Sequence, residues 1–465
     1  MKIRGVELRE IQLSLREHFE ISSGGWSERR ILLLRMETEE GEAWSECVAG
    51  EAPTYSYETP ETAWHILTDF LLPPVLGAEV EEPADILRPS AWVRGHPMAR
   101  AAVEMGAWGL KALEEGVSLS TLLGGNREAV PAGVSVGLQK TDDELLKKVE
   151  EHLASGYRKI KLKIKPGRDV EMVRAVRDRF PEAPLMVDAN SAYTLDDASR
   201  LQELDDLNLM MVEQPLDSED LRQHALLQAR MTTPICLDES IRSAEDTRLA
   251  LQLGSGGIIN IKPGRVGGFT SSTEIHDICA EAGIPVWCGG MLESGVGRAY
   301  NVALASLPNF LLPGDISESR RYWEEDVVEP EFVMADGLMP VPSGGGMGVE
   351  VRRDRVGSLT TRRLWLCPIT TSGTFRRRAI LCAACDCLGP GSRYRRGAMS
   401  LFAHSAAPPT SATPSSSSQM LPKTTSTNIT RASAPAASRK RSRKSSRISS
   451  ETSPRGRFQF SSEKA

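Results

Sequence analysis

The sequence predicts an α/β protein in which an α+β domain precedes a closed barrel of alternating parallel strands and helices. Five short apolar runs lie between residues 161 and 262, each ends in a charged residue, and the steps between those ends are 25, 25, 25 and 24 residues. One strand, a turn, a helix and a return turn occupy such a length. The runs are continuously apolar, as is typical of parallel strands buried on both faces.

The barrel strands follow one another from Val130. VPAGVSVG is the first and is followed by a helical stretch at 142–155; the five runs come next, and IPVWCGG (284–290) and NFLLPGDIS (309–317) bring the total to eight. Further amphipathic stretches separate the strands, at 169–179, 195–204, 244–253 and 270–281.

A doubly wound sheet is the main alternative to a barrel. Its first strand usually leads into a Gly-rich turn that binds a dinucleotide, and no such turn follows the first strand here. GRVGG at 264–268 comes after the sixth strand and lacks the GxGxxG spacing. Eight repeats in succession therefore favour the closed barrel.

Residues 1–125 do not show this alternation of strands and helices. Strand-like segments at 3–15 and 30–37 are followed by GEAWSECVAG, and helical spacing of apolar residues appears at 61–72 and 99–114. Strands followed by helices indicate an α+β domain.

A loop is expected at residues 18–30, between the first two strands. Its sequence HFEISSGGWSERR places Gly24 and Gly25 next to Trp26. Such a segment suits a loop that moves and covers an apolar group. An ordinary surface hairpin with a partly buried Trp26 is the alternative, and these residues alone favour it.

Charge divides the chain near residue 367. The whole has 56 Lys and Arg against 62 Asp and Glu, but residues 367–465 hold 17 basic and 3 acidic residues, which leaves 39 and 59 for residues 1–366. The Ser, Pro and Arg-rich tail has too little apolar surface to fold, so disorder is expected. We expect a domain at 1–125, a barrel at 126–320, a segment at 321–366 that packs back on the first domain, and the tail.

The sequence also bears on location. Cys47, Cys236, Cys279 and Cys288 are scattered without a pairing pattern, as in a cytoplasmic protein. The N-terminus lacks the apolar core of a signal peptide, and no run reaches the roughly twenty apolar residues of a membrane helix. We expect a cytoplasmic protein without membrane contact.

The charged strand ends carry the expected chemistry. In a parallel barrel all strand C-termini open on one face, so these five residues converge there: Lys163, Asp188, Glu213, Asp238 and Lys262. Three carboxylates form an oxygen site suited to Mg²⁺, and the absence of His and Cys among them argues against zinc. The lysines flank the carboxylates, so they would address opposite faces of a bound substrate.

These residues also carry a resemblance. The motifs KLKIKPG, VDAN, VEQP, LDES, NIKPGRVGG, WCGGMLESGVGRA and LPGDIS resemble the muconate-lactonizing subgroup of the enolase superfamily, and within it the o-succinylbenzoate synthase / N-succinylamino acid racemase family. The resemblance covers about residues 1–366. It implies a (β/α)₇β TIM-type barrel beneath an α+β capping domain. A Lys base beside Mg²⁺ is the established pattern for sites of that superfamily.

Residue roles follow from the resemblance. It makes Asp188, Glu213 and Asp238 the ligands of Mg²⁺, which Mn²⁺ or another divalent cation could replace. It makes Lys163 and Lys262 the acid/base pair, with Asn190 and Lys161 in support. In the family the segment at 18–30 closes over the barrel mouth, which favours the covering role for that loop. The expected substrate contacts are Phe19, Ser23, Trp26, Tyr55, Ser135, Asn190, Arg265, Met291 and Glu293.

Two motifs of other relatives are absent from this sequence, which narrows the choice of substrate. Relatives similar to mandelate racemase have a His base at the end of strand seven, where this chain has Cys288 and two glycines. Dipeptide epimerases carry Asp-x-Asp on the last strand to hold an ammonium group, whereas this chain has Asp315 followed by Ile316 and Ser317. A substrate without a free amine is therefore expected.

Two reactions fit the implied site. One is the dehydration that forms o-succinylbenzoate for menaquinone synthesis, and the other is racemisation of an N-succinyl or other N-acylamino acid by both lysines. Arg265, after KPG, occurs in relatives with racemase activity. We favour the synthase, acting on a small carboxylate substrate, in a chain that forms a homo-oligomer.

Other classes of protein fit the sequence less well. The basic tail could bind nucleic acid, but it lacks interleaved aromatics, and we expect an appended or out-of-frame segment. CAACDC at 382–387 is a weak zinc pattern, and NIT at 428–430 fits a glycosylation acceptor. A barrel that has lost catalysis and serves as a scaffold has little support, because the set of charged strand ends is complete.

Overall fold

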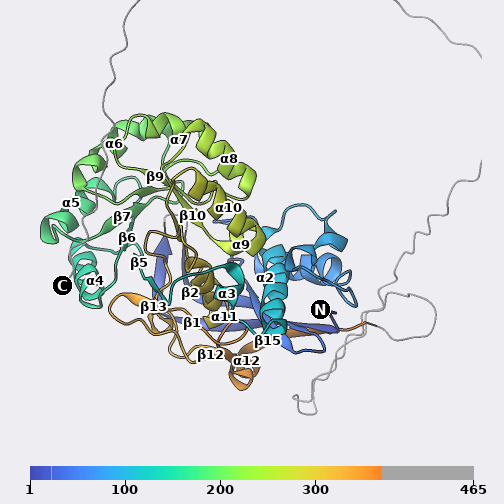
Figure 1. Ribbon diagram of the computed structural model, residues 1–465. Helices are drawn as coiled ribbons and strands as arrows, with labels where there is room; N and C mark the ends of the chain where they lie inside the picture. Colours follow the sequence, from blue (N-terminus) through green and yellow to red (C-terminus); the bar gives the residue numbers. More distant parts are fainter. Residues whose placement is uncertain (22–23, 369–465) are drawn as a thin grey trace, which may run out of the picture. The chain divides into compact units, whose positions relative to one another are not determined.

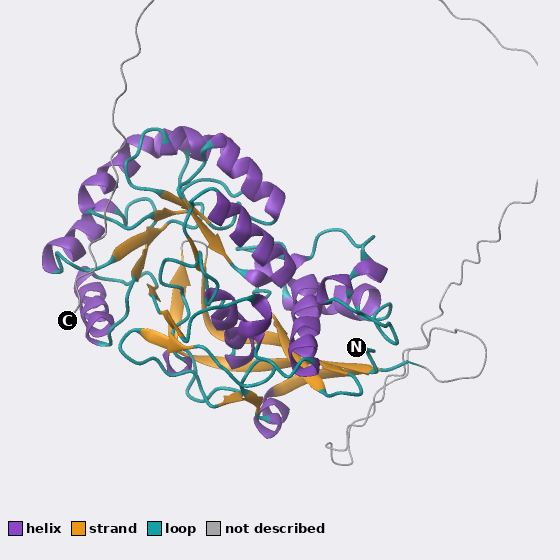
Figure 2. Ribbon diagram, in the orientation of Figure 1, coloured by secondary structure: helices purple, strands orange, loops and turns teal. Residues whose placement is uncertain are grey.

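The computed structural model describes residues 1–21 and 24–368, all within one compact unit (Figure 1). Ser23 and nearly all of the predicted tail, with CAACDC and NIT, lie outside the described residues. An antiparallel sheet with its helices and a curled parallel sheet surrounded by helices are the two main parts (Figure 2). The predicted domain boundaries themselves stay predictions.

The antiparallel sheet combines the two ends of the described chain. Its order is β15-β1-β2-β3. Leu8 pairs with Leu34 of β2 and with Leu364 of β15, so the C-terminal segment packs on the first strand. The bounds are β1 Gly5–Ile21, β2 Gly24–Glu37, β3 Glu42–Cys47 and β15 Thr360–Leu366.

Helix α2 (Pro97–Glu114) lies against this sheet and also faces the barrel. Its small residues permit close approach, because a Cβ on Gly106 would lie 2.6 Å from Met36 Sδ and one on Gly109 would lie 2.5 Å from the hydroxyl of Tyr300. The other helical segments before the barrel are α1 Pro60–Ile66, the π-helical turn Leu67–Leu71, the 3₁₀ turns Pro83–Asp85 and Arg88–Ser90, and α3 Leu119–Leu123.

The prediction of a loop at 18–30 is wrong. Both strands continue into it, and Phe19 pairs with Trp26 while Glu20 pairs with Gly25. At Gly25 the absence of a Cβ leaves room for the imidazole of His18, whose Nε2 would otherwise lie 2.4 Å from it. The segment is a hairpin arm with a register irregularity between Ser14 and Phe19.

The seven-stranded sheet is parallel and follows chain order, β11-β10-β9-β8-β7-β6-β5. Its strands are β5 Val134–Val136, β6 Ile160–Lys163, β7 Leu185–Asp188, β8 Val212–Glu213, β9 Ile235–Leu237, β10 Ile258–Ile261 and β11 Val286–Cys288. Helices follow the strands on the outside (Figure 1), as α4 Asp142–Ala154, α5 Val170–Arg179, α6 Ala198–Gln202, α7 Leu221–Gln228, α8 Ala244–Leu253, α9 Pro263–Val266, α10 Phe269–Glu281 and α11 Gly295–Ala305. The predicted α/β barrel is confirmed, although α7, α9 and α11 were not predicted, and the helix expected at 195–204 is α6 between two 3₁₀ turns.

The eighth predicted strand, residues 309–317, forms isolated bridges rather than a regular ladder. Phe310 bridges Val286, and Gly314 bridges Ala132, both in parallel. Pro313, and Pro308 just before the segment, have no backbone N–H to donate to a neighbouring strand, which explains the irregular pairing. The segment still lies between β11 and β5, since the N–H of Asp315 donates to the carbonyl of Cys288 at 2.8 Å.

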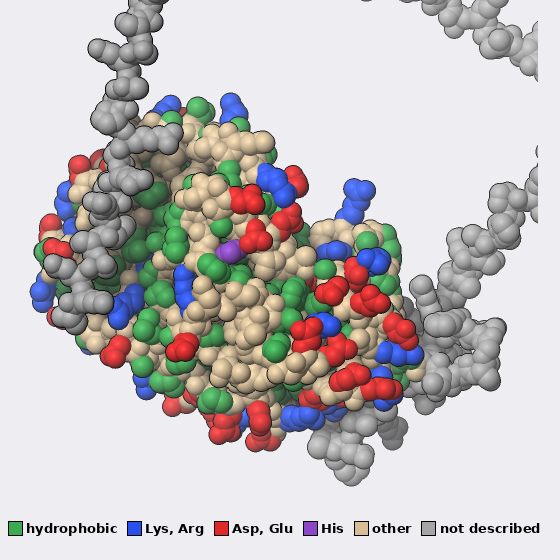
Figure 3. Space-filling view, viewed as in Figure 1, with side chains coloured by type: hydrophobic (Ala, Val, Ile, Leu, Met, Phe, Trp, Pro, Cys, Tyr) green, Lys and Arg blue, Asp and Glu red, His purple; other side chains and the backbone are tan. Residues whose placement is uncertain are grey.

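Small pieces complete the described chain: β4 Ala129–Pro131 with β13 Leu338–Pro340, β12 Val328–Glu329 with β14 Glu350–Val351, the 3₁₀ turn Ser319–Arg321, and α12 Arg353–Leu359. On the face in Figure 3, acidic side chains are prominent over the lower edge, in keeping with the acidic composition of residues 1–366. None of the helices in the described residues combines the length and apolarity needed to cross a membrane.

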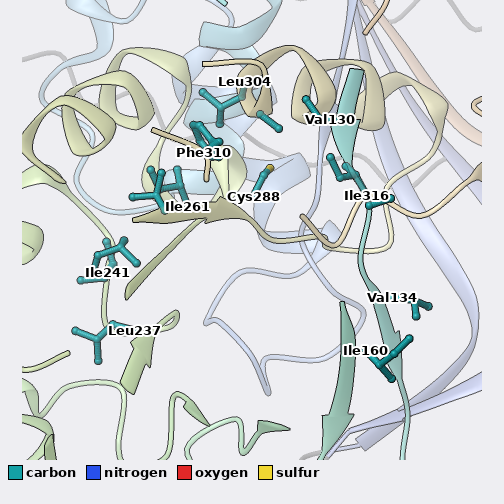
Figure 4. Close-up of a cluster of buried hydrophobic side chains, with 14 of the residues drawn as sticks. Val130, Val134, Ile160, Leu237, Ile241, Ile261, Cys288, Leu304, Phe310 and Ile316 are labelled. Carbon is teal, nitrogen blue, oxygen red and sulfur yellow. The ribbon is translucent and has the colours of Figure 1, made fainter. Parts of the chain in front are cut away.

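The barrel core lies between the strands and the helices around them. Ile160, Leu237 and Ile261 from three strands and Phe310 from the closing segment are buried there (Figure 4). Complete burial of one such side chain contributes about 1.5–3 kcal/mol. This packing fixes the strands, and hence the side chains at their ends.

Candidate active site

A cavity that is open to solvent lies at the C-terminal ends of the barrel strands. Both parts of the molecule line it. The capping part contributes Phe19, Trp26, Arg29 and Tyr55, and the barrel contributes Ser135, Lys161, Lys163, Asn190, Lys262, Met291 and Asp315. The aromatic hairpin arm and the charged strand ends thus face one space, as a site for a partly apolar anion requires.

Three buried carboxylates form a row on neighbouring strands. Asp188 and Glu213 are opposite one another in the pairing of β7 with β8, and Asp238 follows β9 directly. All three are at most 1% exposed. The predicted convergence of these side chains is therefore present in the structure.

The lysines reach this row from opposite sides. Lys163, on β6, donates to Asp188 at 2.6 Å. Lys262, directly after β10, donates to Asp238 at 2.7 Å. Lys161 lies between the ends of the row, with Nζ 3.2 Å from Glu213 and 3.4 Å from Asp188.

The ionisation of the row reflects burial and neighbouring charge. Burial and then the Asp188 carboxylate raise the pKa of Glu213 to about 8. Burial opposes ionisation of Asp188 as well, but Lys163 and Lys161 outweigh it and hold the pKa of Asp188 below its ordinary value. Burial lowers the pKa of Lys262, yet Asp238, Tyr55 and Glu213 together outweigh burial and raise it.

The residues fit a hard divalent cation. In the part of the chain that the structure describes, no three acidic, His or Cys side chains stand as an assembled metal site, because Lys and Arg groups occupy the carboxylates. The donors are nevertheless all carboxylate oxygens on neighbouring strands, the ligand type that Mg²⁺ prefers. A dication held by Asp188, Glu213 and Asp238 would compete with the lysines for these carboxylates.

Asn190 and Tyr55 hold the lysines in place. Asn190 accepts from Lys163 at 2.7 Å and donates to Glu239 at 2.9 Å, and its own N–H donates to Asp188 at 3.0 Å. Its left-handed backbone, with φ 43°, is one that Asn tolerates. The Tyr55 hydroxyl accepts from Lys262 at 3.0 Å and donates to Asp238 at the same distance, so a capping residue contacts the barrel row.

The remaining predicted contacts differ in position. Phe19, Trp26, Ser135 and Met291 line the cavity. Arg265 lies deeper, ion-paired with Asp238 and donating to the carbonyl of Ile241 at 2.6 Å. Glu293 is outside the cavity lining and accepts from the N–H of Met291 at 2.7 Å and from Asn301 at 2.8 Å.

Several residues of the site were not predicted. Gln214 accepts from the N–H groups of Asp238 and Ser240 at 3.0 and 3.2 Å and so fixes the turn after β9. Asn260 donates to Glu213 at 2.8 Å. Asn260 is two residues before Lys262, so strand alternation would have indicated it, whereas no local pattern distinguishes Gln214 or Arg29.

Comparisons with known proteins cover most of the chain. Residues 3–124 match the family model described as mandelate racemase / muconate lactonizing enzyme, N-terminal domain, and residues 144–355 match the one described as enolase C-terminal domain-like. A protein of Geobacillus kaustophilus named o-succinylbenzoate synthase is 50% identical over 361 residues, 77% of this chain and 96% of that protein. One of Amycolatopsis sp named N-succinylamino acid racemase is 49% identical over 367 residues, 79% of this chain and 100% of that protein.

A solved structure has the same arrangement. It belongs to an enolase superfamily member from Listeria innocua, with 40% sequence identity and a TM-score of 0.76, and the match covers 78% of this chain and 99% of that one. These relatives and this structure each match between 77% and 79% of this chain.

Proposed function

The chain belongs to the mandelate racemase / muconate lactonizing enzyme family of the enolase superfamily, and from this premise we propose that it is a lyase that forms o-succinylbenzoate. The substrate would be a cyclohexadiene carboxylate that loses water. One observation carries the proposal: two buried lysines flank a row of three carboxylates beneath a cavity with an aromatic wall. The relative that is 50% identical bears the name of this activity.

The proposed cofactor is Mg²⁺, held by Asp188, Glu213 and Asp238. When bound, the ion would stabilise the negative charge that develops on the substrate carboxylate as the α-proton leaves. The carboxylate chemistry of these three side chains supports this choice over zinc.

Lys163 is the proposed base. It takes the α-proton of the substrate, and the same ammonium then gives a proton to the departing hydroxyl, so a C–H bond and a C–O bond break, a C=C bond forms and water leaves. Asn190 and Asp188 orient the Nζ of Lys163. Lys262 remains an ammonium on the other side of the substrate and stabilises the enediolate.

Racemisation of N-succinylamino acids is the second candidate. The favouring observation is that Lys163 and Lys262 both line the cavity while contacting carboxylates two strands apart, which places a proton-transfer group on each side. The Amycolatopsis relative, 49% identical, bears that name. Arg265 contacts Asp238 and the Tyr55 hydroxyl, and it would act on Lys262 through these two groups.

Parallel assays on the full-length protein test both reactions. With Mg²⁺ present, we expect o-succinylbenzoate to form from its dehydration precursor, followed by its ultraviolet absorbance. N-succinyl-L-amino acids are monitored in the same preparation by chiral chromatography. Formation of neither product would refute the proposed function, and racemisation alone would replace the first candidate with the second.

We also propose that the enzyme acts in the cytoplasm as a homo-oligomer without membrane or nucleic-acid partners. The thiols of Cys47, Cys236, Cys279 and Cys288 are free and buried, which suits a reducing compartment. Size-exclusion chromatography with light scattering measures the oligomeric state.

A further inference from the structure

A third lysine, directly before β6, has no part in the proposed reaction. Lys159 lies two residues before Lys161, and alternation on the strand sends Lys159, Lys161 and Lys163 to the same face. The Lys159 side chain is 0% exposed. Its Nζ is 3.4 Å from the centre of the Trp287 ring and 3.1 Å from Asp315 Oδ1. A buried ammonium is costly without a partner, so this position needs an explanation.

Asp315 connects Lys159 to the active site. One carboxylate oxygen is ion-paired with Lys161, and the other faces Lys159. The contact to Lys159 is electrostatic and not aligned as a hydrogen bond, since both Nζ of Lys159 and Oδ1 of Asp315 have no hydrogen-bond partner among the described residues. The two residues therefore form a buried ion pair, and Lys159 also contacts the Trp287 ring.

The surrounding backbone provides the space for this pair. A Cβ on Gly133 would lie 2.6 Å from Cε of Lys159, so only Gly lets the Lys159 side chain pass. The N–H of Asp315 donates to Cys288 at 2.8 Å, which fixes the carboxylate on the segment that closes the barrel. Buried ion pairs are weak contributors to stability, so stability alone does not explain this construction.

Lys161 is shared between Asp315 and two of the proposed metal ligands. Its Nζ is 3.2 Å from Glu213 and 3.4 Å from Asp188 in addition to the ion pair with Asp315. A dication at Glu213 and Asp188 would repel this ammonium at short range. Asp315 offers Lys161 a partner on the side away from the row.

We propose that Lys159 and Asp315 are positioning residues for the metal site: Asp315, held by Lys159, draws the ammonium of Lys161 away from Glu213 and Asp188 so that these carboxylates can take a divalent cation. This inference rests on the metal site of the proposed function. Neither residue contacts the reacting atoms in this scheme. Both act through Lys161.

Mn²⁺ binding to the metal-free, full-length protein tests the inference without an activity readout. Free Mn²⁺ is measured by electron paramagnetic resonance during titration. We expect Asp315→Asn to raise the Kd by about 10-fold or more, within the range known for supporting residues of metal sites. Lys159→Met raises it by a smaller factor. Asp169→Asn is the matched control, because Asp169 is also buried and ion-paired, with Arg200, and its variant should bind Mn²⁺ as the wild type does.

A double-mutant cycle separates positioning from a general charge effect. In a Lys161→Met background, Asp315→Asn should change the Kd less than about twofold, because no ammonium remains to be positioned. Unchanged affinity of Asp315→Asn in the wild-type background would overturn the inference. So would an equal loss in both backgrounds, which would indicate long-range charge only.

Two further outcomes have defined meanings. Failure of the wild type to bind Mn²⁺ overturns the proposed metal site and this inference with it, whereas normal binding that ignores Asp315 overturns the inference alone. If Asp315→Asn fails to fold by circular dichroism, the variant with both Lys159→Met and Asp315→Leu removes the buried pair together and carries the same expected loss of affinity.

Discussion

Buried carboxylates occur in two regions of the molecule and are balanced by different partners. At the barrel mouth, Asp188 and Asp238 face lysine and arginine side chains. At the contact of the antiparallel sheet and α2 with the barrel, Glu46 and Glu104 face backbone N–H groups at the starts of two barrel helices. The first set of partners can rotate away when a ligand brings charge, and the second set cannot.

The contact region shows how a fixed arrangement is built. Glu46 accepts from the N–H of Gly297 at 3.0 Å and from the hydroxyl of Ser294 at 2.6 Å, at the start of α11. Glu104 accepts from the N–H groups of Phe269 and Thr270 at 2.8 and 2.9 Å, at the start of α10. Carboxylates at helix N-termini are stabilised by the exposed N–H groups and the helix dipole. We therefore assign the contact region to stability and the barrel mouth to ligand exchange.

Removal of divalent cations should affect the barrel mouth most. After dialysis against a chelator, we expect activity to fall to background and to return with Mg²⁺. The fold should persist, because lysines balance the carboxylates without metal. Calorimetry should show added stability on metal binding, about 2.7 kcal/mol at one hundred times the Kd. Full activity after exhaustive chelation would remove the basis for assigning ligand exchange to the mouth.

Replacement of Glu46 should affect the contact region. Glu46→Ala leaves buried N–H groups of Ser294 and Gly297 without an acceptor, so the free energy of unfolding should fall by about 2–4 kcal/mol. Urea denaturation measures this loss. Glu281→Ala, an exposed residue at the end of α10, is the control and should be near neutral. A loss of activity without a loss of stability would reverse the assignment of the two regions.

Stability at the contact region should also depend on pH. Burial raises the pKa of Glu46 from an ordinary 4.5 to about 8 and outweighs the hydrogen bonds from Ser294 and Gly297, which favour the carboxylate; the charge of Glu293 adds to the increase. Because the folded state holds this proton more tightly, the contribution to stability is complete below the unfolded pKa and is lost as the pH rises through the folded pKa. Between pH 5 and 8, the wild type should lose on the order of 3 kcal/mol relative to Glu46→Gln. Parallel pH curves for the two proteins would contradict the shift.

The difference between the regions also explains what could be predicted from sequence. The barrel mouth was predictable because charged residues end successive strands at near-constant spacing along the sequence: Lys163, Asp188, Glu213, Asp238 and Lys262. Local pattern and chemistry coincide there.

The contact region could not be predicted in this way. Glu46 and Ser294 are far apart in the chain, and neither belongs to a repeating pattern. The same holds for the hairpin arm, where Phe19 pairs with Trp26 beyond a register irregularity. The irregular closing segment near Asp315 reflects prolines whose effect depends on both neighbouring strands. Such features arise from contacts across the fold and not from local periodicity.

The most direct test of the account compares Lys163→Ala with Lys165→Ala in the dehydration assay with Mg²⁺. Lys165 is two residues further along the chain but has only a distant ion pair, 4.0 Å from Glu20, and is 41% exposed. We predict that Lys163→Ala lowers kcat by about 10³-fold or more while Mn²⁺ still binds, and that Lys165→Ala retains wild-type turnover. Turnover by Lys163→Ala close to that of Lys165→Ala would contradict the assignment of Lys163 as the base.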